Sequence, residues 1–169
     1  MNDLGKLKKK RVMAVASAGG HWVQLQRIRT AWNDCSVTYV TTKPGYEAQV
    51  KMDARDRGEE VPSYHVVTDA NRWQKFRLIR QIFEVFFVTI RTRPNIVIST
   101  GAAPGFFALK FGKMLGARTI WIDSIANAEI LSLSGQKAES CADLWMTQWP
   151  HLAEAKEGDR GPEYKGSVI

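Results

Sequence analysis

Cysteine is scarce in this chain of 169 residues: only Cys35 and Cys141 are present, and they form no Cys-x-x-Cys pair. No apolar segment of the secretory type precedes them, so we expect a reducing, cytoplasmic setting rather than a disulfide framework. Metal-ligand spacing is missing among His21, His65 and His151, and no Asp-x-Asp pair occurs. The sequence therefore predicts neither a bound metal nor another cofactor.

Acidic residues are the minority among the charged side chains. Asp and Glu number 17 against 24 Lys and Arg, which gives a net charge of +7. Such a charge favours a polyanionic partner, for example nucleic acid, acidic lipid or pyrophosphate. No recognisable RNA- or DNA-binding module accompanies the charge, so we expect no nucleic-acid partner.

Internal repeats, low-complexity segments and domain linkers are absent as well. The chain is 44% hydrophobic, which is enough for one substantial core. We therefore expect a single domain over residues 1–169, with a basic segment at 1–10 and an amphipathic basic helix at 72–93.

Short apolar runs alternate with helix-like patterns along the chain. The strand-like runs lie at residues 12–16, 37–41, 61–67, 96–99, 119–123 and 144–148. The helix-like patterns lie at residues 22–32, 46–57, 72–92 and 104–115. Almost wholly apolar strands separated by helices are typical of a parallel sheet that is covered on both faces. The sequence predicts a doubly wound, mostly parallel, Rossmann-like α/β fold, in which ligands bind beyond the carboxyl ends of the strands.

The first predicted strand ends in Ser17-Ala18-Gly19-Gly20-His21, which places an imidazole at a strand-to-helix turn. Two glycines permit a sharp turn and close approach of a ligand, while the first helical turn presents unpaired amides and a partial positive charge. That turn suits a phosphate, a carboxylate or a developing oxyanion. The same partial charge favours a neutral imidazole, so His21 is suited to act as a base. The alternative is a capping turn whose histidine only packs.

Other enzyme classes need patterns that this turn lacks. A dinucleotide site needs Gly-x-Gly-x-x-Gly and an acid after the second strand, whereas this chain has Ala-Ser-Ala-Gly-Gly-His and then Thr41-Thr42. A Walker loop ends in Gly-Lys-Ser/Thr and a serine-hydrolase elbow reads Gly-x-Ser-x-Gly, and neither pattern occurs. A nucleotide-binding Rossmann domain of unrelated purpose stays open as a weaker alternative.

Residues 72–93 combine six basic side chains with a broad aromatic and aliphatic face and the single acid Glu84. The uncharged stretch 85–90 is far shorter than the ~20 residues of a bilayer-spanning helix, so this helix can lie in an interface but not cross it. We expect it to contact a membrane surface together with the basic N-terminus. The expected membrane-binding residues are Arg72, Trp73, Lys75, Phe76, Arg77, Arg80, Phe83 and Phe87. Alternatively, its apolar face packs on the sheet and its arginines are solvated.

Several motifs occur in a characteristic order. They are Ala18-Gly19-Gly20-His21, the segment 94–102, Asp123-Ser124, the segment 131–135, Ala142-Asp143 and Gln148-Trp149-Pro150. Together they resemble the oligosaccharide-biosynthesis glycosyltransferase subunits, a family that includes the membrane-anchoring subunit of the eukaryotic dolichol-linked chitobiose synthase and the bacterial PssD/CpsF-type polysaccharide proteins. The resemblance covers residues 12–168. Such proteins look like the N-terminal half of a GT-B glycosyltransferase, and a separate chain supplies the donor-binding half.

The resemblance implies a membrane-associated, acceptor-binding subunit of a two-chain inverting glycosyltransferase. A partner subunit would bring the UDP-sugar, and the acceptor would be a polyprenyl-diphosphate-linked saccharide for an exported polysaccharide. Eukaryotic members carry an N-terminal transmembrane helix that this sequence lacks, so we expect peripheral attachment at the inner face of the cell membrane instead. A non-catalytic recruiter of a complete transferase is the alternative.

The resemblance implies that His21 deprotonates the acceptor hydroxyl. Asp123 either orients the imidazole, serves as the base itself or caps the loop that follows it. Thr100-Gly101-Ala102 forms a second candidate cradle for an acceptor phosphate, with a simple tight turn as its alternative. The expected substrate-binding residues are Ser17, Gly19, Gly20, Thr100, Gly101, Ala102, Ser124, Asn127, Glu129 and Ser134.

Overall fold

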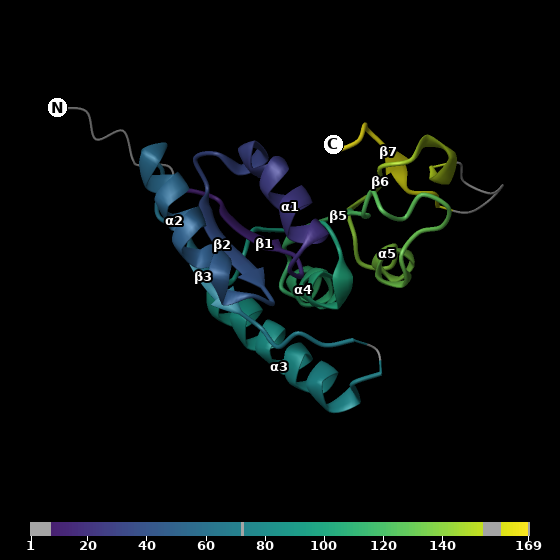
Figure 1. Cartoon of the computed structure of the whole chain (residues 1–169), viewed down its shortest axis with the longest axis horizontal. Helices are drawn as coiled ribbons and strands as arrows, with labels where there is room; N and C mark the ends of the chain where they lie inside the picture. The colour runs from purple at the N-terminus through teal and green to yellow at the C-terminus, as the bar shows by residue number, and fades with distance from the viewer. Residues whose placement is uncertain (1–7, 72, 154–159, 169) are drawn as a thin grey trace.

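The computed structural model describes residues 8–71, 73–153 and 160–168. Its centre is a seven-stranded sheet in the order β3-β2-β1-β4-β5-β6-β7, and every neighbouring pair is parallel (Figure 1). The strands are β1 (Arg11–Val15), β2 (Ser36–Thr41), β3 (Ser63–Val66), β4 (Ile96–Ser99), β5 (Arg118–Ile122), β6 (Leu144–Thr147) and β7 (Glu163–Tyr164). The predicted parallel α/β fold is confirmed.

Helices lie between consecutive strands and cover both faces of the sheet (Figure 1). The α-helices are α1 (Gly20–Arg27), α2 (Glu47–Asp56), α3 (Lys75–Thr92), α4 (Ala102–Met114) and α5 (Leu133–Ala138). Short 3₁₀ segments, η1 (Arg29–Trp32), η2 (Pro44–Tyr46) and η3 (Pro150–Leu152), extend three of the connections. The predicted helix 22–32 is thus two elements, α1 and η1.

Two buried clusters hold these layers together, because successive side chains of each strand point to opposite faces. On one face Met13 and Val97 pack with residues of α3, α4 and α5, including the fully buried Leu109. On the other face Val12 and Ala14 pack with residues of α1 and α2. Burial on both faces explains why the central strands are almost wholly apolar.

Helix α3 has apolar side chains on two faces. Its buried side contains Gln81, Val85 and Thr89. The Gln81 amide donates a 2.6 Å hydrogen bond to the Thr68 carbonyl, and the Thr89 hydroxyl donates a 2.7 Å hydrogen bond to the Val85 carbonyl. The Gln81 NH₂ group and the Thr89 hydroxyl therefore keep a partner in the interior, whereas the buried Gln81 Oε1 has none among the described residues.

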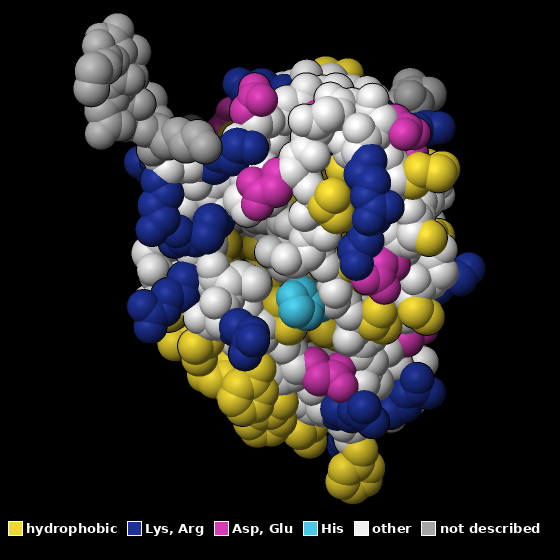
Figure 2. Space-filling view, turned by 90° about the vertical axis from the view of Figure 1, so that its left-hand side faces the viewer, with side chains coloured by type: hydrophobic (Ala, Val, Ile, Leu, Met, Phe, Trp, Pro, Cys, Tyr) yellow, Lys and Arg dark blue, Asp and Glu magenta, His cyan; other side chains and the backbone are white. Residues whose placement is uncertain are grey.

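The opposite side of α3 exposes a row of large apolar side chains, which we call the α3 stripe. Figure 2 shows a hydrophobic patch beside lysine and arginine side chains on this side of the molecule. The α3 stripe consists of Phe76, Ile79, Phe83, Phe87 and Ile90, of which Phe76 is 89% exposed. Packing on the sheet thus uses other residues of the helix than the α3 stripe. Arg72 of the predicted membrane-binding set lies outside the described residues, as do residues 1–7 of the basic N-terminal segment.

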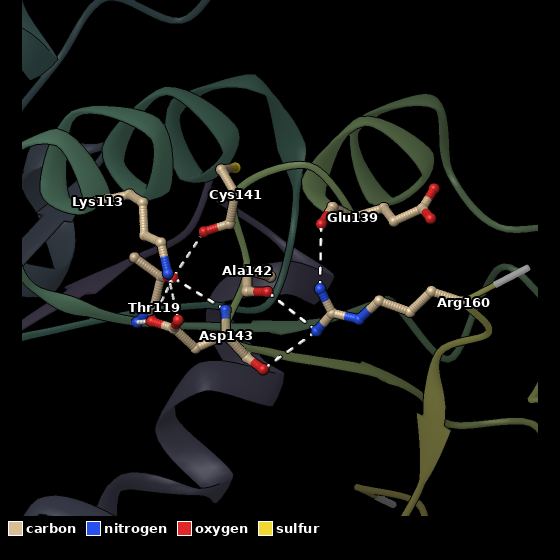
Figure 3. Close-up of polar contacts among 7 residues, drawn as sticks. All are labelled: Lys113, Thr119, Glu139, Cys141, Ala142, Asp143 and Arg160. Atoms are coloured by element: carbon tan, nitrogen blue, oxygen red, sulfur yellow. Dashed lines mark hydrogen bonds and ion pairs between the residues drawn. The ribbon is translucent and has the colours of Figure 1, made fainter.

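The start of β6 is tied to β5 by Asp143 (Figure 3). Its carboxylate accepts a 2.9 Å hydrogen bond from the Thr119 amide and a further one from the Lys113 ammonium. The Lys113 ammonium and the Thr119 donors hold the pKa of Asp143 below its ordinary value. This ion pair also joins the last turn of α4 to the start of β6.

Arg160 attaches the C-terminal segment to the same region (Figure 3). Its guanidinium donates to the carbonyls of Ala142 and Asp143, at 3.1 Å each, and to that of Glu139 at 3.4 Å. Glu139 is the C-cap of α5, where a cation favourably meets unpaired carbonyls. These contacts position the short strand β7, which the sequence did not predict.

Candidate active site at the strand switch point

The strand order reverses between β1 and β4, which are adjacent although they lie far apart in the chain. From β1 the chain proceeds through α1 to β2 on one side, and from β4 it proceeds through α4 to β5 on the other. The pairing of Val15 with Ser99 aligns the carboxyl ends of both strands. In open α/β sheets this switch point is the usual place for a ligand.

The turn between β1 and α1 borders free space, and side-chain hydrogen bonds fix its backbone. Gly19 is the N-cap of α1 and has a φ of +83°, a backbone conformation that favours glycine. A Cβ atom on Gly19 or Gly20 would meet no atom within 4 Å, so both glycines border free space. The Thr42 hydroxyl accepts a 3.0 Å hydrogen bond from the Ala18 amide, and the Tyr46 hydroxyl accepts one of 3.3 Å from the Gly19 amide.

His21, in the first turn of α1, joins this turn to the one that follows β4. Its Nδ1 lies 3.0 Å from the Thr100 carbonyl, and the Thr100 hydroxyl donates a 2.7 Å hydrogen bond to the His21 carbonyl. A carbonyl only accepts, so Nδ1 carries the proton and the lone pair of the neutral ring lies on Nε2. No hydrogen bond to Nε2 is formed within the described part of the chain. The half-buried ring therefore has a fixed tautomer and a basic nitrogen free to accept a proton.

The turn before α4 is shaped around the His21 ring. Gly101 has a φ of +140° and serves as the N-cap of α4, and Ala102 follows at a φ of +68°. A Cβ atom on Gly101 would lie 2.3 Å from His21 Nδ1, so only glycine leaves room for the imidazole. The Ser99 hydroxyl accepts a 3.1 Å hydrogen bond from the Gly101 amide.

Two helix N-termini thus flank one imidazole. Among the residues that the structure describes, neither α1 nor α4 has a side-chain hydrogen bond at its N-cap, and neither has an acidic residue in its first turn. Unpaired amides and the partial positive charge of a helix start stabilise an anion. The arrangement can hold an anionic group and remove a proton beside it.

Asp123 follows β5 and faces its own loop. The carboxylate, only 1% exposed, accepts hydrogen bonds from Ser132 N (2.8 Å), Ser132 Oγ (2.6 Å), Trp121 Nε1 (3.2 Å) and Asn127 Nδ2 (3.3 Å). Ser132 in turn caps α5 by accepting from the Gly135 amide. Of the roles that the sequence left open, this geometry favours the cap of the following loop.

Comparison with known proteins places the chain among relatives. The family described as "Oligosaccharide biosynthesis protein Alg14 like" matches residues 12–167. The chain belongs to this family. A mouse protein named UDP-N-acetylglucosamine transferase subunit ALG14 is 26% identical to this Alg14-like chain, over 85% of the chain and 77% of the relative. The protein of the same name from Eremothecium gossypii is 23% identical, over 89% and 77%.

Solved structures share the fold of this Alg14-like chain. The structure of Acinetobacter baumannii MurG superposes with a TM-score of 0.65 at 14% sequence identity, over 87% of this chain and 44% of MurG. A putative UDP-N-acetylglucosamine 2-epimerase from Listeria monocytogenes gives a TM-score of 0.57 at 12% identity, over 83% and 39%. The chain therefore spans less than half the length of these structures.

The remaining substrate-binding candidates of this Alg14-like chain lie at different distances from the switch point. Ser17 is half-buried in the turn before α1. Ser124 is buried and accepts a 3.1 Å hydrogen bond from Gln24, while Asn127 is engaged with Asp123. Glu129 is exposed and Ser134 lies on α5. The structure thus brings together Ser17, Gly19, Gly20, His21, Thr100, Gly101 and Ala102, whereas the other candidates lie on the β5–α5 connection and α5.

Four supporting residues were not singled out from the sequence as part of the site. Thr42 and Tyr46 hold the glycine turn, and the Tyr46 ring stacks on Trp22 at a centroid distance of 4.9 Å. Gln24 and the almost fully buried Gln148 form a 2.6 Å hydrogen bond between α1 and the end of β6. The small polar residues after β2 were a usable signal for Thr42, and Gln148 belongs to the Gln148-Trp149-Pro150 motif, but no pattern marks its pairing with Gln24.

Charge near α3 is partly neutralised within the fold. Partial burial raises the pKa of Glu84, but hydrogen bonds from Thr68 and Arg80 outweigh burial and leave the pKa below its ordinary value.

Within residues 8–71, 73–153 and 160–168, no group of His, Cys, Asp or Glu is arranged to hold a metal ion. Over the same residues, no helix has the length and apolar character needed to span a bilayer.

Proposed function

We propose that this chain is the acceptor-binding subunit of a two-chain, inverting glycosyltransferase. The observation that carries the proposal is the imidazole of His21, with its Nε2 free and its Nδ1 fixed by Thr100, between two helix N-termini. Membership of the Alg14-like family supports the reaction class, since relatives are named UDP-N-acetylglucosamine transferase subunits.

In the proposed reaction, His21 Nε2 removes the proton of the acceptor hydroxyl as its oxygen attacks the anomeric carbon of the UDP-sugar. The bond from that carbon to the UDP oxygen breaks, and inversion follows from attack on the opposite side. The Thr100 carbonyl stabilises the imidazolium through Nδ1–H. General-base assistance of this kind contributes about 10²- to 10⁴-fold in rate.

The acceptor in this proposal is a saccharide linked to a polyprenyl diphosphate. Its diphosphate would lie at the start of α4, where Gly101 and Ala102 turn the backbone so that the first helical amides face the switch point. Asp123 acts as a positioning residue that fixes the loop before α5. A net charge of +7 suits the anionic acceptor.

A second chain would supply the donor-binding half. The curated relatives of this chain are named as subunits of a transferase, which supports a second chain. UDP-N-acetylglucosamine is the first donor to test because it appears in the names of those relatives. The reaction would extend a lipid-linked saccharide that becomes part of an exported polysaccharide.

Reconstitution tests this division of labour. We expect sugar transfer from UDP-N-acetylglucosamine to a polyprenyl-diphosphate-linked saccharide when this chain and the donor-binding chain of the same organism are combined. Neither chain alone should catalyse sugar transfer, because one chain binds the acceptor and the other binds the donor. Radiolabelled product extracted into organic solvent measures the reaction. Tight UDP-sugar binding and full turnover by this chain alone would contradict the proposal.

We also propose that the α3 stripe rests on the inner face of the cell membrane, which makes the protein peripheral. The α3 stripe is apolar and exposed, and it is flanked on the same helix by Lys75, Arg77, Arg80 and Arg91 and by Arg93 at its end. A basic residue near an anionic leaflet contributes about 1 kcal/mol. Apolar insertion and charge attraction together suit an interfacial helix.

Flotation with vesicles tests the membrane contact. The protein should co-float with anionic phospholipid vesicles at low salt, and the double substitution Phe83→Ser/Phe87→Ser should abolish most of this binding, because both side chains are more than half exposed. The matched control is the double substitution Met114→Ser/Leu115→Ser, which changes two exposed apolar residues at the C-terminal end of α4, outside the α3 stripe. If the α3 stripe variant floats as well as the wild-type protein, lipid binding resides elsewhere.

A further inference from the structure

An open cavity of about 430 Å³ lies between helices α3, α4 and α5. Its walls are largely aromatic and aliphatic, and its size falls within the range of small-molecule sites. The residues that define its character are Leu78, Phe106, Phe107, Leu133, Ser134 and Lys137. Neither the reaction nor the membrane contact proposed above uses this cavity.

The apolar walls contain packed aromatic rings and are partly open to solvent. Phe106 and Phe107 pack with a centroid distance of 5.3 Å, and Phe107 also stacks on Phe111 at 6.4 Å. Leu133, on the α5 side, is 57% exposed. An apolar depression on a monomer marks a binding site for an apolar group.

One side of the cavity is cationic and adjoins the switch point. Lys137 and Ser134 on α5 contribute an ammonium and a hydroxyl, and among the residues that the structure describes no Asp or Glu lines the cavity. Ala103 lines it from the first turn of α4, directly after the Gly101–Ala102 turn. A ligand that fits this distribution has an apolar body and an anionic head.

The cavity also adjoins helix α3, which carries the α3 stripe on another face. Leu78 lines the cavity from the first half of α3, while its helix neighbours Phe76 and Ile79 belong to the α3 stripe. The same helix therefore borders the proposed lipid surface on one side and the cavity on the other.

We propose that this cavity binds the first isoprene units of the acceptor lipid, those next to the diphosphate, and that Lys137 pairs with that diphosphate. The inference rests on the proposed function, because it assigns the lipid part of the same acceptor. It makes the polyprenyl chain a recognised part of the substrate rather than only a membrane anchor. The enzyme would then select its acceptor by the isoprene units beside the diphosphate as well as by the saccharide.

Photo-crosslinking tests the cavity without requiring turnover. The full chain is irradiated with a diazirine-bearing farnesyl diphosphate, and labelled peptides are identified by mass spectrometry. Labelling should fall on residues 103–107 and 133–137, and unlabelled farnesyl diphosphate should displace it whereas inorganic diphosphate should not. Substitution of Ser134→Trp, which fills the cavity, should remove most of the label. Displaceable labelling confined to the α3 stripe, or labelling that nothing displaces, would overturn the inference.

Kinetics of the reconstituted pair provide the second readout. For Leu133→Ser, the KM for a polyprenyl acceptor relative to that for a saccharide diphosphate that carries no isoprene unit should rise about tenfold, because an apolar contact to the lipid is lost. Leu115→Ser is the control, because it makes the same change at an exposed leucine at the C-terminal end of α4. Transfer with an unchanged KM ratio would overturn the cavity while the proposed function stands. If the pair transfers to no lipid diphosphate at all, the proposed function fails, and crosslinking still decides the cavity.

Discussion

Substitution of His21 by alanine should lower the transfer rate of the reconstituted enzyme by about 10²- to 10⁴-fold. The reason is the loss of Nε2, the free basic nitrogen beside two helix N-termini. The acceptor hydroxyl would then have to lose its proton to water during attack. Initial rates at saturating donor and acceptor measure kcat directly, so the effect is separable from acceptor binding.

The same substitution should leave the fold largely intact. His21 is half-buried, and its side chain makes one hydrogen bond, to the Thr100 carbonyl. Removing such a bond costs about 1 kcal/mol, a small part of the stability of a domain of this size. The unfolding temperature should therefore fall by only about 2–4 °C, and co-purification with the donor-binding chain should match the wild-type protein.

His151→Asn provides a matched control. His151 also places a ring nitrogen on a backbone carbonyl, 2.6 Å from the oxygen of Ala128, but it is exposed and lies in the loop after β6. Transfer by this variant should stay close to the wild-type rate. Near-normal turnover by His21→Ala would instead support the alternative in which this chain only recruits a complete transferase.

The arrangement of the sheet could be predicted from the sequence because the signal is repeated. Each central strand is a short apolar run followed by small polar residues, and each is separated from the next by a helical pattern. Helix α5 and strand β7 were not predicted, since Leu133–Ala138 is only six residues long and Glu163–Tyr164 only two. Their positions depend on tertiary contacts: Gly135 packs so closely on Asp123 that a Cβ atom there would lie 2.5 Å from the carboxylate.

The candidate site was only partly predictable for a related reason. The glycine turn and His21 form one local segment, so their type and spacing are visible in the sequence. The partner of the imidazole is the carbonyl of Thr100, a backbone atom that any residue possesses, and only the pairing of β1 with β4 brings it within 3.0 Å. For Asp123, sequence reasoning could not decide whether the carboxylate faces the crevice or its own loop.

Substitution of Asp123 by alanine should destabilise the protein by about 3 kcal/mol, a large effect for one side chain. The carboxylate is 1% exposed and accepts hydrogen bonds from Trp121, Asn127 and both donors of Ser132. Alanine would leave these donors without their acceptor in a buried space, and it would release Ser132 from the position in which it caps α5. Urea unfolding of the full chain measures the change in the free energy of unfolding.

Asp56→Ala is the control, because Asp56 is exposed at the end of α2 and its loss should change the free energy of unfolding by less than about 0.5 kcal/mol. Asp123→Asn should fall between the two, since the amide oxygen can still accept from Ser132 whereas its NH₂ group opposes the remaining donors. Activity decides between the roles of the carboxylate. If Asp123→Ala unfolds at the wild-type urea concentration yet transfers no sugar, the carboxylate is catalytic and His21 is not the sole base; if stability falls as expected, reduced transfer follows from a loosened β5–α5 loop.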